Sequence, residues 1–441
     1  MSDESPGRSE PYAYPADLAR LVHQHWTEAG ETREAETAPS AATLEAFFAP
    51  CYQASLLREE ERPVTFRAIL AAPSLFARDG RPPESVQRLE FASPLPFDGA
   101  ELRRLSVATD AHRTLIGVDR DGQGGWQIWG LVSSGTRWLR DVEGGRRAAA
   151  PLPPVPVVHV DGPGSVAAHQ GTRLVATLLR GRLSGLRADP FASQWLPQQF
   201  LGLRDQLMAR HLAAAAQARA GGEVWADVEP TLPRRISERM MKRVIALLRE
   251  ARHGGTIVFV PAAQVAELTG GEPSLDIKYR FTAGLPQRSF PALVVDLLNR
   301  LAQVAGGAAA PPRGVVGWHE FEAATDDALA TLDESLFEVA HLIAGLASAD
   351  GAVVMTKEQD LVGFGGMITG RLPAVRRVAR ALDLEGDHVA HEDVGGVGAR
   401  HRSAYRLSAG VPESVVIVVS QDGGVRFVAQ KDGRVTYWEQ D

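Results

Sequence analysis

Cysteine is almost absent from this 441-residue sequence. Cys51 is the only one, so no disulfide can form within the chain, which fits a reducing compartment. Long apolar runs are also lacking: no stretch approaches the roughly 20 residues that a membrane-spanning helix needs. The first 15 residues are polar and acidic, without the basic and apolar regions of a secretory signal. The sequence therefore predicts a cytoplasmic protein with no membrane association.

Basic residues are fewer than acidic ones in this chain, and most of them are arginines rather than lysines. The chain has 54 acidic residues against 47 basic ones, which gives a formal net charge of -7. This balance lacks the basic face that bulk nucleic-acid binding requires. Only four of the basic residues are lysines. Arginine therefore carries most of the positive charge, and its planar guanidinium suits phosphate groups.

The rest of the composition is globular, with 44% apolar residues, and a chain of this length holds two or three domains. Residues 1–40 are predicted to be a flexible tail with a short helix at 14–29. Residues 41–188 alternate between apolar and polar positions over short stretches, which predicts a β-rich α+β domain. Within this domain, the segments 115–119 and 126–131 flank a turn-forming stretch and predict a hairpin.

The second half of the chain has helical spacing interrupted by short apolar runs. Residues 189–233 are predicted to be a helical connector. An amphipathic helix at 234–252 and a buried strand at 256–260 begin a predicted α/β domain that occupies residues 234–441. The same patterns predict helices at 290–304 and 326–346 and strands at 275–281, 353–355, 360–364 and 415–419, with a terminal hairpin at 424–438.

Two short motifs in this α/β region carry the residue types of phosphate chemistry. The first is Asp350-Gly351-Ala352, between a predicted helix and a predicted strand. A carboxylate there can hold a divalent metal ion or accept a hydroxyl proton. The second places Arg400 and Arg402 just after a glycine-rich stretch. Guanidinium groups and the exposed N–H groups of glycines suit a polyphosphate.

Each motif alone also has a structural explanation. Asp-Gly is a common turn pair that occurs seven times in this chain, and an Arg-His-Arg triplet is often a solvated basic loop. Both motifs in one α/β region favour a phosphate site, because nucleotidyl transfer depends mainly on positioning and charge neutralisation. The segment 387–393 places two histidines among acidic residues and is interpreted as an acidic surface loop rather than as a separate metal site.

Residues from about 234 to the C-terminus resemble the diadenylate cyclase domain family (DAC, DisA N-terminal type). That family carries an Asp-Gly-Ala motif followed by a Gly-Thr-Arg-His-Arg-(Ser/Ala/Thr)-Ala motif. In this chain the second motif is Gly398-Ala399-Arg400-His401-Arg402-Ser403-Ala404. The segment 44–183 resembles the DACNV type of sensor module, which is found ahead of some DAC domains. The resemblance implies a mixed sheet flanked by helices in the C-terminal domain.

The resemblance also implies an activity. In the DAC family, two domains face each other with one ATP each, and the 3′-hydroxyl of each ATP attacks the α-phosphate of the other. The products are cyclic di-AMP and two pyrophosphates. The chain is therefore expected to be an enzyme, a diadenylate cyclase, that self-associates as a homo-oligomer. Its N-terminal module is expected to respond to a signal, a small molecule or a protein, that the sequence does not identify.

The family's site residues carry over to this chain motif by motif. Asp350 is implied to be catalytic and to bind Mg²⁺ or Mn²⁺. ATP binding is implied for Gly351, Ala352, Ile368, Gly398, Ala399, Arg400, His401, Arg402, Ser403 and Ser420. The chain departs from the family at Ala399, where threonine is usual, and at Gln421-Asp422, where membrane-type members carry two glutamates. Asp422 is accordingly the second candidate metal ligand.

These departures leave two other functions open. In one, the domain binds ATP or cyclic di-AMP without turnover and serves as a nucleotide sensor. In the other, neither domain binds a nucleotide and the chain is a scaffold.

Overall fold

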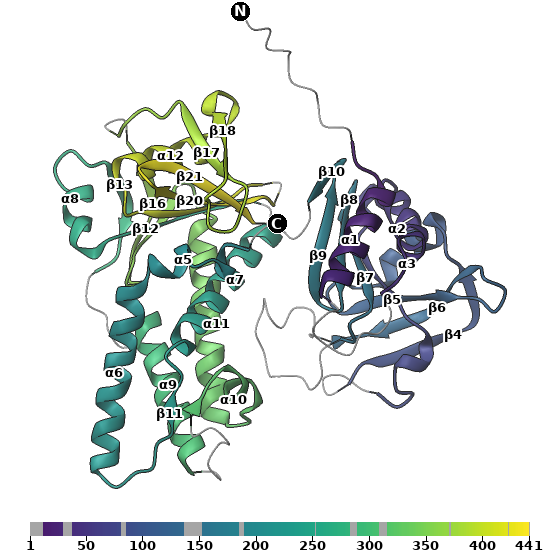
Figure 1. Cartoon of the computed structure of the whole chain (residues 1–441), viewed down its shortest axis with the longest axis horizontal. Coiled ribbons are helices and arrows are strands. Elements are labelled where there is room, and N and C mark those ends of the chain that lie inside the picture. Colours follow the sequence, from purple (N-terminus) through teal and green to yellow (C-terminus); the bar gives the residue numbers. More distant parts are fainter. Residues whose placement is uncertain are drawn as a thin grey trace, which may run out of the picture. The chain divides into compact units, whose positions relative to one another are not determined.

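Two compact units make up the part of the chain that the computed structural model describes. The described residues are 12–29, 38–80, 85–135, 152–184, 189–251, 253–282, 289–307, 315–369, 372–421 and 423–440. The first unit holds the described residues up to 184, and the second holds those from 189 onward. Figure 1 shows that each unit has its own sheet and its own helices. None of the helices in these ranges is long and apolar enough to cross a membrane.

The first unit is built on an eight-stranded mixed sheet with the order β10-β9-β8-β7-β3-β5-β6-β4. Strands β3 and β5 are parallel and the other neighbours are antiparallel. The strands are β3 (Phe66–Leu70), β4 (Gln87–Pro96), β5 (Thr114–Arg120), β6 (Trp126–Ser133), β7 (Pro156–Gly162), β8 (Ser165–Gln170), β9 (Arg173–Leu179) and β10 (Arg182–Ser184). A separate two-stranded ribbon pairs β1 (Arg58–Glu59) with β2 (Arg62–Pro63).

Three helices pack against this sheet: α1 (Pro15–Ala29), α2 (Ala41–Ser55) and α3 (Gly99–Ala108). Leu18 and Val22 of α1 are buried in the same apolar cluster as Phe66 of β3. The prediction of a flexible tail over residues 1–40 is therefore wrong for α1, because this helix closes part of the core. Cys51 is fully buried in that cluster, and burial raises the pKa of its thiol.

The hairpin predicted from residues 115–131 is confirmed as β5–β6. Trp126 packs against the helix-covered core, whereas Trp129 is buried in a smaller cluster with Phe76. The Trp129 Nε1–H donates to the carbonyl oxygen of Ala71 at 2.8 Å. The two tryptophans thus face opposite sides of the strand, as alternation along a strand requires. Strands β4 and β8 were not predicted.

The second unit is built on a nine-stranded mixed sheet with the order β13-β16-β15-β12-β19-β20-β21-β17-β18. Strand β12 runs parallel to β15, β17 runs parallel to β21, and the other neighbours are antiparallel. The strands are β12 (Gly255–Val260), β13 (Leu275–Arg280), β15 (Ala352–Thr356), β16 (Leu361–Ile368), β17 (Arg377–Ala381), β18 (Val389–Asp393), β19 (Val415–Val419), β20 (Val425–Lys431) and β21 (Arg434–Gln440). A short parallel pair joins β11 (Asp227–Val228) and β14 (Val315–Val316).

Helices cover both faces of this sheet, and β12 shows how its side chains divide between them. Ile257 and Phe259 belong to the larger apolar cluster, whereas Val258 belongs to a second one. The larger cluster includes residues of α5 (Trp195–Gln198), α6 (Leu201–Ala220), α7 (Leu232–Ala251), α9 (Phe290–Gly307), α10 (Trp318–Ala323) and α11 (Asp327–Ala347). The second cluster includes residues of α8 (Val265–Thr269) and α12 (Ala399–Gly410).

The segment 189–233 was predicted to be a helical connector, but the structure places it inside the second unit. Leu203 and Leu207 of α6 are buried in the larger cluster. The ring of Phe200 meets the ring of Phe259 edge-on, with the two centroids 5.3 Å apart. Helix α6 is therefore part of the layer that covers one face of the sheet.

Candidate functional site

The Asp-Gly-Ala motif lies where α11 leads into β15. Asp350 is exposed in this short connection. Gly351 has a φ of 101°, and a Cβ atom at this position would lie 2.5 Å from the carbonyl carbon of Gly365 on β16. Ala352 is buried and pairs with Gly366. The close approach of two strands therefore requires glycine at 351, and it leaves the preceding carboxylate at the exposed start of β15.

The neighbouring strand brings a second glycine to the same end of the sheet. Thr256 of β12 pairs with Ala352 of the parallel strand β15. Gly254 and Asp350 lie within two residues of the starts of these two neighbouring strands, so both belong to the same end of the sheet.

Arg400 reaches this point from α12. The register of β12 with β19 pairs Gly255 with Val419, which places Gly254 beside Ser420. The Arg400 Nη1 atom lies 3.1 Å from the position that a Cβ atom on Gly254 would occupy. That Cβ would also lie 2.6 Å from the carbonyl oxygen of Val419, and the φ of Gly254 is 64°. Glycine at 254 therefore gives the guanidinium room against the backbone.

The Arg-His-Arg motif forms the first turn of α12 rather than a loop. Gly398 is the N-cap residue, and no side chain caps this end of the helix. The first-turn N–H groups of a helix lack intrahelical partners and favour an anion. Arg402 is exposed, and its Nη2 donates to the carbonyl oxygen of Val397 at 3.1 Å. The rings of His401 and Tyr405 lie 6.5 Å apart, so this imidazole stands over the buried side of the helix.

A polar network that sequence reasoning missed holds α12 on the sheet. The buried Tyr405 hydroxyl accepts a hydrogen bond from Arg426 Nη1 at 3.1 Å, and Arg426 Nη2 lies 2.9 Å from Glu439 Oε1. The Arg426 guanidinium stacks 4.4 Å from the ring centroid of Tyr437, whose hydroxyl donates to Glu392 Oε2 at 2.6 Å. Burial raises the pKa of both tyrosine hydroxyls. Four separate elements supply these residues, so no local pattern could have identified them.

The remaining predicted site residues lie at separate positions in the second unit or outside the described residues. Ile368 is half-buried at the end of β16, and the register that pairs Ala352 with Gly366 places it at the same sheet end as Asp350. The Ser420 hydroxyl donates to the carbonyl oxygen of Gly424 at 3.0 Å and thereby closes the turn before β20. Ala399 is exposed and Ser403 is half-buried in the first turns of α12, whereas Asp422 lies outside the described residues.

The carboxylates at this sheet end do not form a closed metal cage. Among the described residues, no group of three or more histidine, cysteine, aspartate or glutamate side chains is placed to hold a metal ion. Mg²⁺ commonly takes one or two carboxylates together with waters and substrate phosphates, so Asp350 fits an ion that arrives with a triphosphate. Side chains of the acidic segment 387–393 instead contact other side chains: His388 Nδ1 lies 2.6 Å from Asp383 Oδ2, and Asp387 forms an ion pair with Lys431 at 2.7 Å.

The first unit provides the link to known proteins. Residues 33–133 match the family model described as "Probable sensor domain DACNV". The matched range includes α2, α3 and the strands β1 to β6. The match supports the predicted sensor role of the N-terminal part of the chain. No curated protein matches this chain.

Proposed function

We propose that the second unit is a diadenylate cyclase and that the first unit regulates it. The observation that supports this proposal is that both motifs lie at one end of the sheet: Asp350 just before β15, and the Arg400 guanidinium over Gly254, just before the neighbouring strand β12. One motif supplies a carboxylate and the other supplies a guanidinium at the N-terminus of a helix. Those are the groups that nucleotidyl transfer needs, because the reaction depends on deprotonating a hydroxyl and on neutralising phosphate charge.

The proposed reaction uses two molecules of ATP. Each 3′-hydroxyl loses its proton and forms an ester bond to the α-phosphorus of the other ATP, while the bond from that phosphorus to pyrophosphate breaks. Asp350 accepts or directs the proton, and Arg400 with the first turn of α12 holds the phosphates. A divalent cation would supply further charge neutralisation when bound, and Asp350 would be one of its ligands. The second unit of each chain binds one ATP in this proposal, so the second units of two chains must face each other.

The regulatory part of the proposal rests on the first unit. Residues 33–133 match a sensor domain, and this segment precedes the second unit in the chain. DACNV modules occur ahead of some DAC domains, and the motif pair in the second unit resembles that of a DAC domain except at Ala399. The order of the two units is therefore the order expected of a sensor-regulated cyclase.

The test is a product assay on the full chain. Purified protein is incubated with ATP and either Mg²⁺ or Mn²⁺, and the products are resolved by mass spectrometry alongside a pyrophosphate assay. We expect cyclic di-AMP with two pyrophosphates per product molecule, and a specific activity that rises with protein concentration. Absence of cyclic di-AMP with both metals over a wide range of protein concentration would overturn the cyclase proposal.

One observation favours a second candidate function. Ala399 occupies the first turn of α12, where a threonine hydroxyl is usual in the family, so one phosphate or metal contact is missing. A unit that binds ATP without turnover is the function expected if that contact is essential. Calorimetry with ATP distinguishes the two functions: binding without pyrophosphate release identifies a nucleotide sensor. A ligand that binds only the folded state also raises the melting temperature, so a flat thermal response to ATP opposes both functions.

A further inference from the structure

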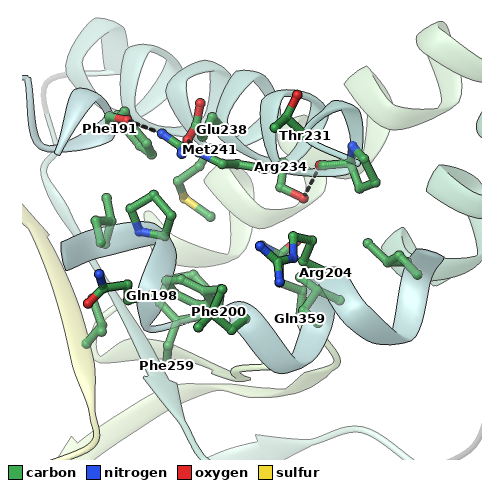
Figure 2. Close-up of a pocket in the computed structure, with 18 of the residues that line it drawn as sticks. Phe191, Gln198, Phe200, Arg204, Thr231, Arg234, Glu238, Met241, Phe259 and Gln359 are labelled. Carbon is green, nitrogen blue, oxygen red and sulfur yellow. Dashed lines mark hydrogen bonds and ion pairs between the residues drawn. The ribbon is translucent and has the colours of Figure 1, made fainter. Parts of the chain in front are cut away.

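A cavity of about 300 Å³ lies in the second unit, away from the two sequence motifs. Its floor is the sheet, through Phe259 of β12, Ile417 of β19 and Phe427 of β20. Figure 2 shows Arg234 and Met241 on the wall formed by α7. The opposite wall belongs to α5, α6 and the residues between them.

This cavity lies at a different position along β12 from the strand end at Gly254. Phe259 belongs to the apolar cluster beneath the large helical layer, whereas α12 packs on the other face of the sheet. Phe259 also lies five residues further along the chain than Gly254, which is about 16 Å of extended strand. A molecule in this cavity therefore does not occupy the candidate nucleotide site.

The charged groups that line the cavity already have partners. Arg234 Nε lies 2.6 Å from Glu238 Oε1, so this pair is neutral as a whole. Arg204 Nη2 is held 2.7 Å from the Asp205 carboxylate. The Ser237 hydroxyl donates to a backbone carbonyl one turn earlier in α7, at 3.0 Å. These groups give the cavity no net demand for a charged ligand.

Gln359 is the exception among the lining residues. The residue is 7% exposed, and its Oε1 atom is buried without a hydrogen-bond partner among the described residues. Gln359 has a φ of 63°, a left-handed conformation that is uncommon outside glycine, asparagine and aspartate. A buried carbonyl oxygen without a partner costs free energy that a ligand donor would recover.

The loop that carries Gln359 is fixed from both sides. The Gln359 N–H donates to the carbonyl oxygen of Thr356 at 2.9 Å, and the Lys357 N–H donates to that of Val260 at 2.9 Å. Lys357 Nζ donates to Gln199 Oε1 at 3.0 Å, which ties the loop to the segment between α5 and α6. These bonds fix the backbone from which the buried Gln359 side chain extends to the cavity wall.

We propose that this cavity binds a small, neutral, mainly apolar molecule that donates one hydrogen bond to Gln359 Oε1. The paired charges argue against an ionic ligand, and the aromatic floor favours a flat apolar body. The volume is at the lower end of the range for ligand pockets, which suits a molecule the size of two fused rings. The proposal does not depend on the cyclase activity.

The test compares two probes of the same shape on the full chain. Indole has an N–H donor, and indene lacks it. We expect indole to bind, by calorimetry and thermal shift, about threefold to tenfold more tightly than indene, because one buried hydrogen bond is worth that much. Saturating ATP is expected to leave indole binding unchanged. No binding of either probe, equal affinity for both, or competition by ATP would overturn the proposal.

Two variants make the test specific. Gln359→Asn keeps a residue that tolerates the left-handed backbone but withdraws the oxygen by one methylene, so the preference for indole is expected to disappear. Gln198→Asn is the matched control, since Gln198 is an exposed lining residue, and the preference is expected to persist. Met241→Trp fills the cavity from α7 and is expected to abolish binding of both probes without lowering the melting temperature. An unchanged preference in Gln359→Asn, or intact binding in a folded Met241→Trp variant, would contradict the assigned site.

Discussion

The two faces of the nine-stranded sheet are specialised in different ways. Beneath the large helical layer, strand side chains such as Phe259 and Ile417 form an apolar floor, and the cavity lies against it. On the α12 side, buried tyrosines and an arginine–glutamate pair hold a helix whose first turn is rich in charge. Asp350 and Arg400 lie at one end of the sheet, where Gly351 and Gly254 leave the backbone bare. In mid-strand, large apolar side chains line a cavity. At the strand ends, glycines leave space for charged groups next to the backbone.

The largest expected effect at the strand ends is that of Asp350→Asn, which tests the proposed role of this carboxylate. In protein that makes cyclic di-AMP, we expect the rate to fall by about 10²–10³, the usual cost of one transition-state contact. The melting temperature should change little, because Asp350 is exposed. Mass spectrometry of the products measures the effect. The control is Asp432→Asn, in the exposed turn between β20 and β21. Full activity in Asp350→Asn would remove this carboxylate from the mechanism.

The glycine pair 351 and 433 separates crowding from backbone strain. Both have a left-handed φ, 101° and 74°, but nothing lies within 4 Å of a Cβ on Gly433, whereas one on Gly351 would overlap the backbone of Gly365. We expect Gly433→Ala to lower the free energy of unfolding by about 1 kcal/mol and Gly351→Ala by about 2 kcal/mol more. Urea denaturation measures both. Equal losses would mean that β15 and β16 are not as close as described.

Arg400 and Arg377 provide a test of phosphate binding. Arg400→Ala removes the guanidinium that lies over Gly254, and we expect ATP affinity to fall about tenfold or more, the value of a charge-assisted hydrogen bond. Arg377→Ala, an exposed change in β17, is the control and should leave affinity unchanged. Arg402→Ala is expected to have an intermediate effect, because Arg402 is exposed and donates to the carbonyl oxygen of Val397, just before α12. Calorimetry with ATP decides the ranking, and unchanged affinity in Arg400→Ala contradicts the placement of the phosphates.

The smallest expected effect concerns the start of α11, the helix that leads to Asp350. The Asp326 carboxylate accepts from the Leu329 N–H and pairs with Arg300 at 2.6 Å, and the hydrogen bond from Arg300 lowers the pKa of Asp326 to about 2. Its pKa in the unfolded chain is near 3.8, so its contribution is complete above about pH 4 and is lost as the pH falls toward 2. Asp326→Asn should cost about 1 kcal/mol at neutral pH, and less near pH 2. Urea midpoints measured across this window test the sign; a constant difference between the two proteins would refute it.

Local pattern was sufficient for the elements with the clearest spacing. The helix predicted at 234–252 rested on Ile236, Met240 and Val244, which recur on one helical face and are buried in α7. The strands at 256–260 and 415–419 are continuous apolar runs, typical of strands covered on both faces. Helix α12 was missed because charged residues fill its first turn, and β4 because most of its side chains are exposed.

The candidate site was only partly accessible from sequence. The motifs contain Asp350 and Arg400, but their position at the same end of the sheet depends on strand order and register, which no local pattern reports. Tyr405 and Arg426 interact through helix packing across the sheet. The cavity forms where α5 and α6 pack over the strands. Helical spacing predicts helices in this segment but does not indicate what they pack against, so the cavity could not be predicted.

Helix α1 has a practical consequence for anyone who isolates the first unit. Leu18 and Val22 of this helix are buried in the apolar core of the first unit. The Ala13 N–H donates to the carbonyl oxygen of Gly181, in the turn between β9 and β10, at 2.8 Å. A fragment cut to the matched residues 33–133 would discard this helix together with four of the eight strands. Ligand screens against the sensor half should therefore use protein that begins before residue 12 and continues past residue 184.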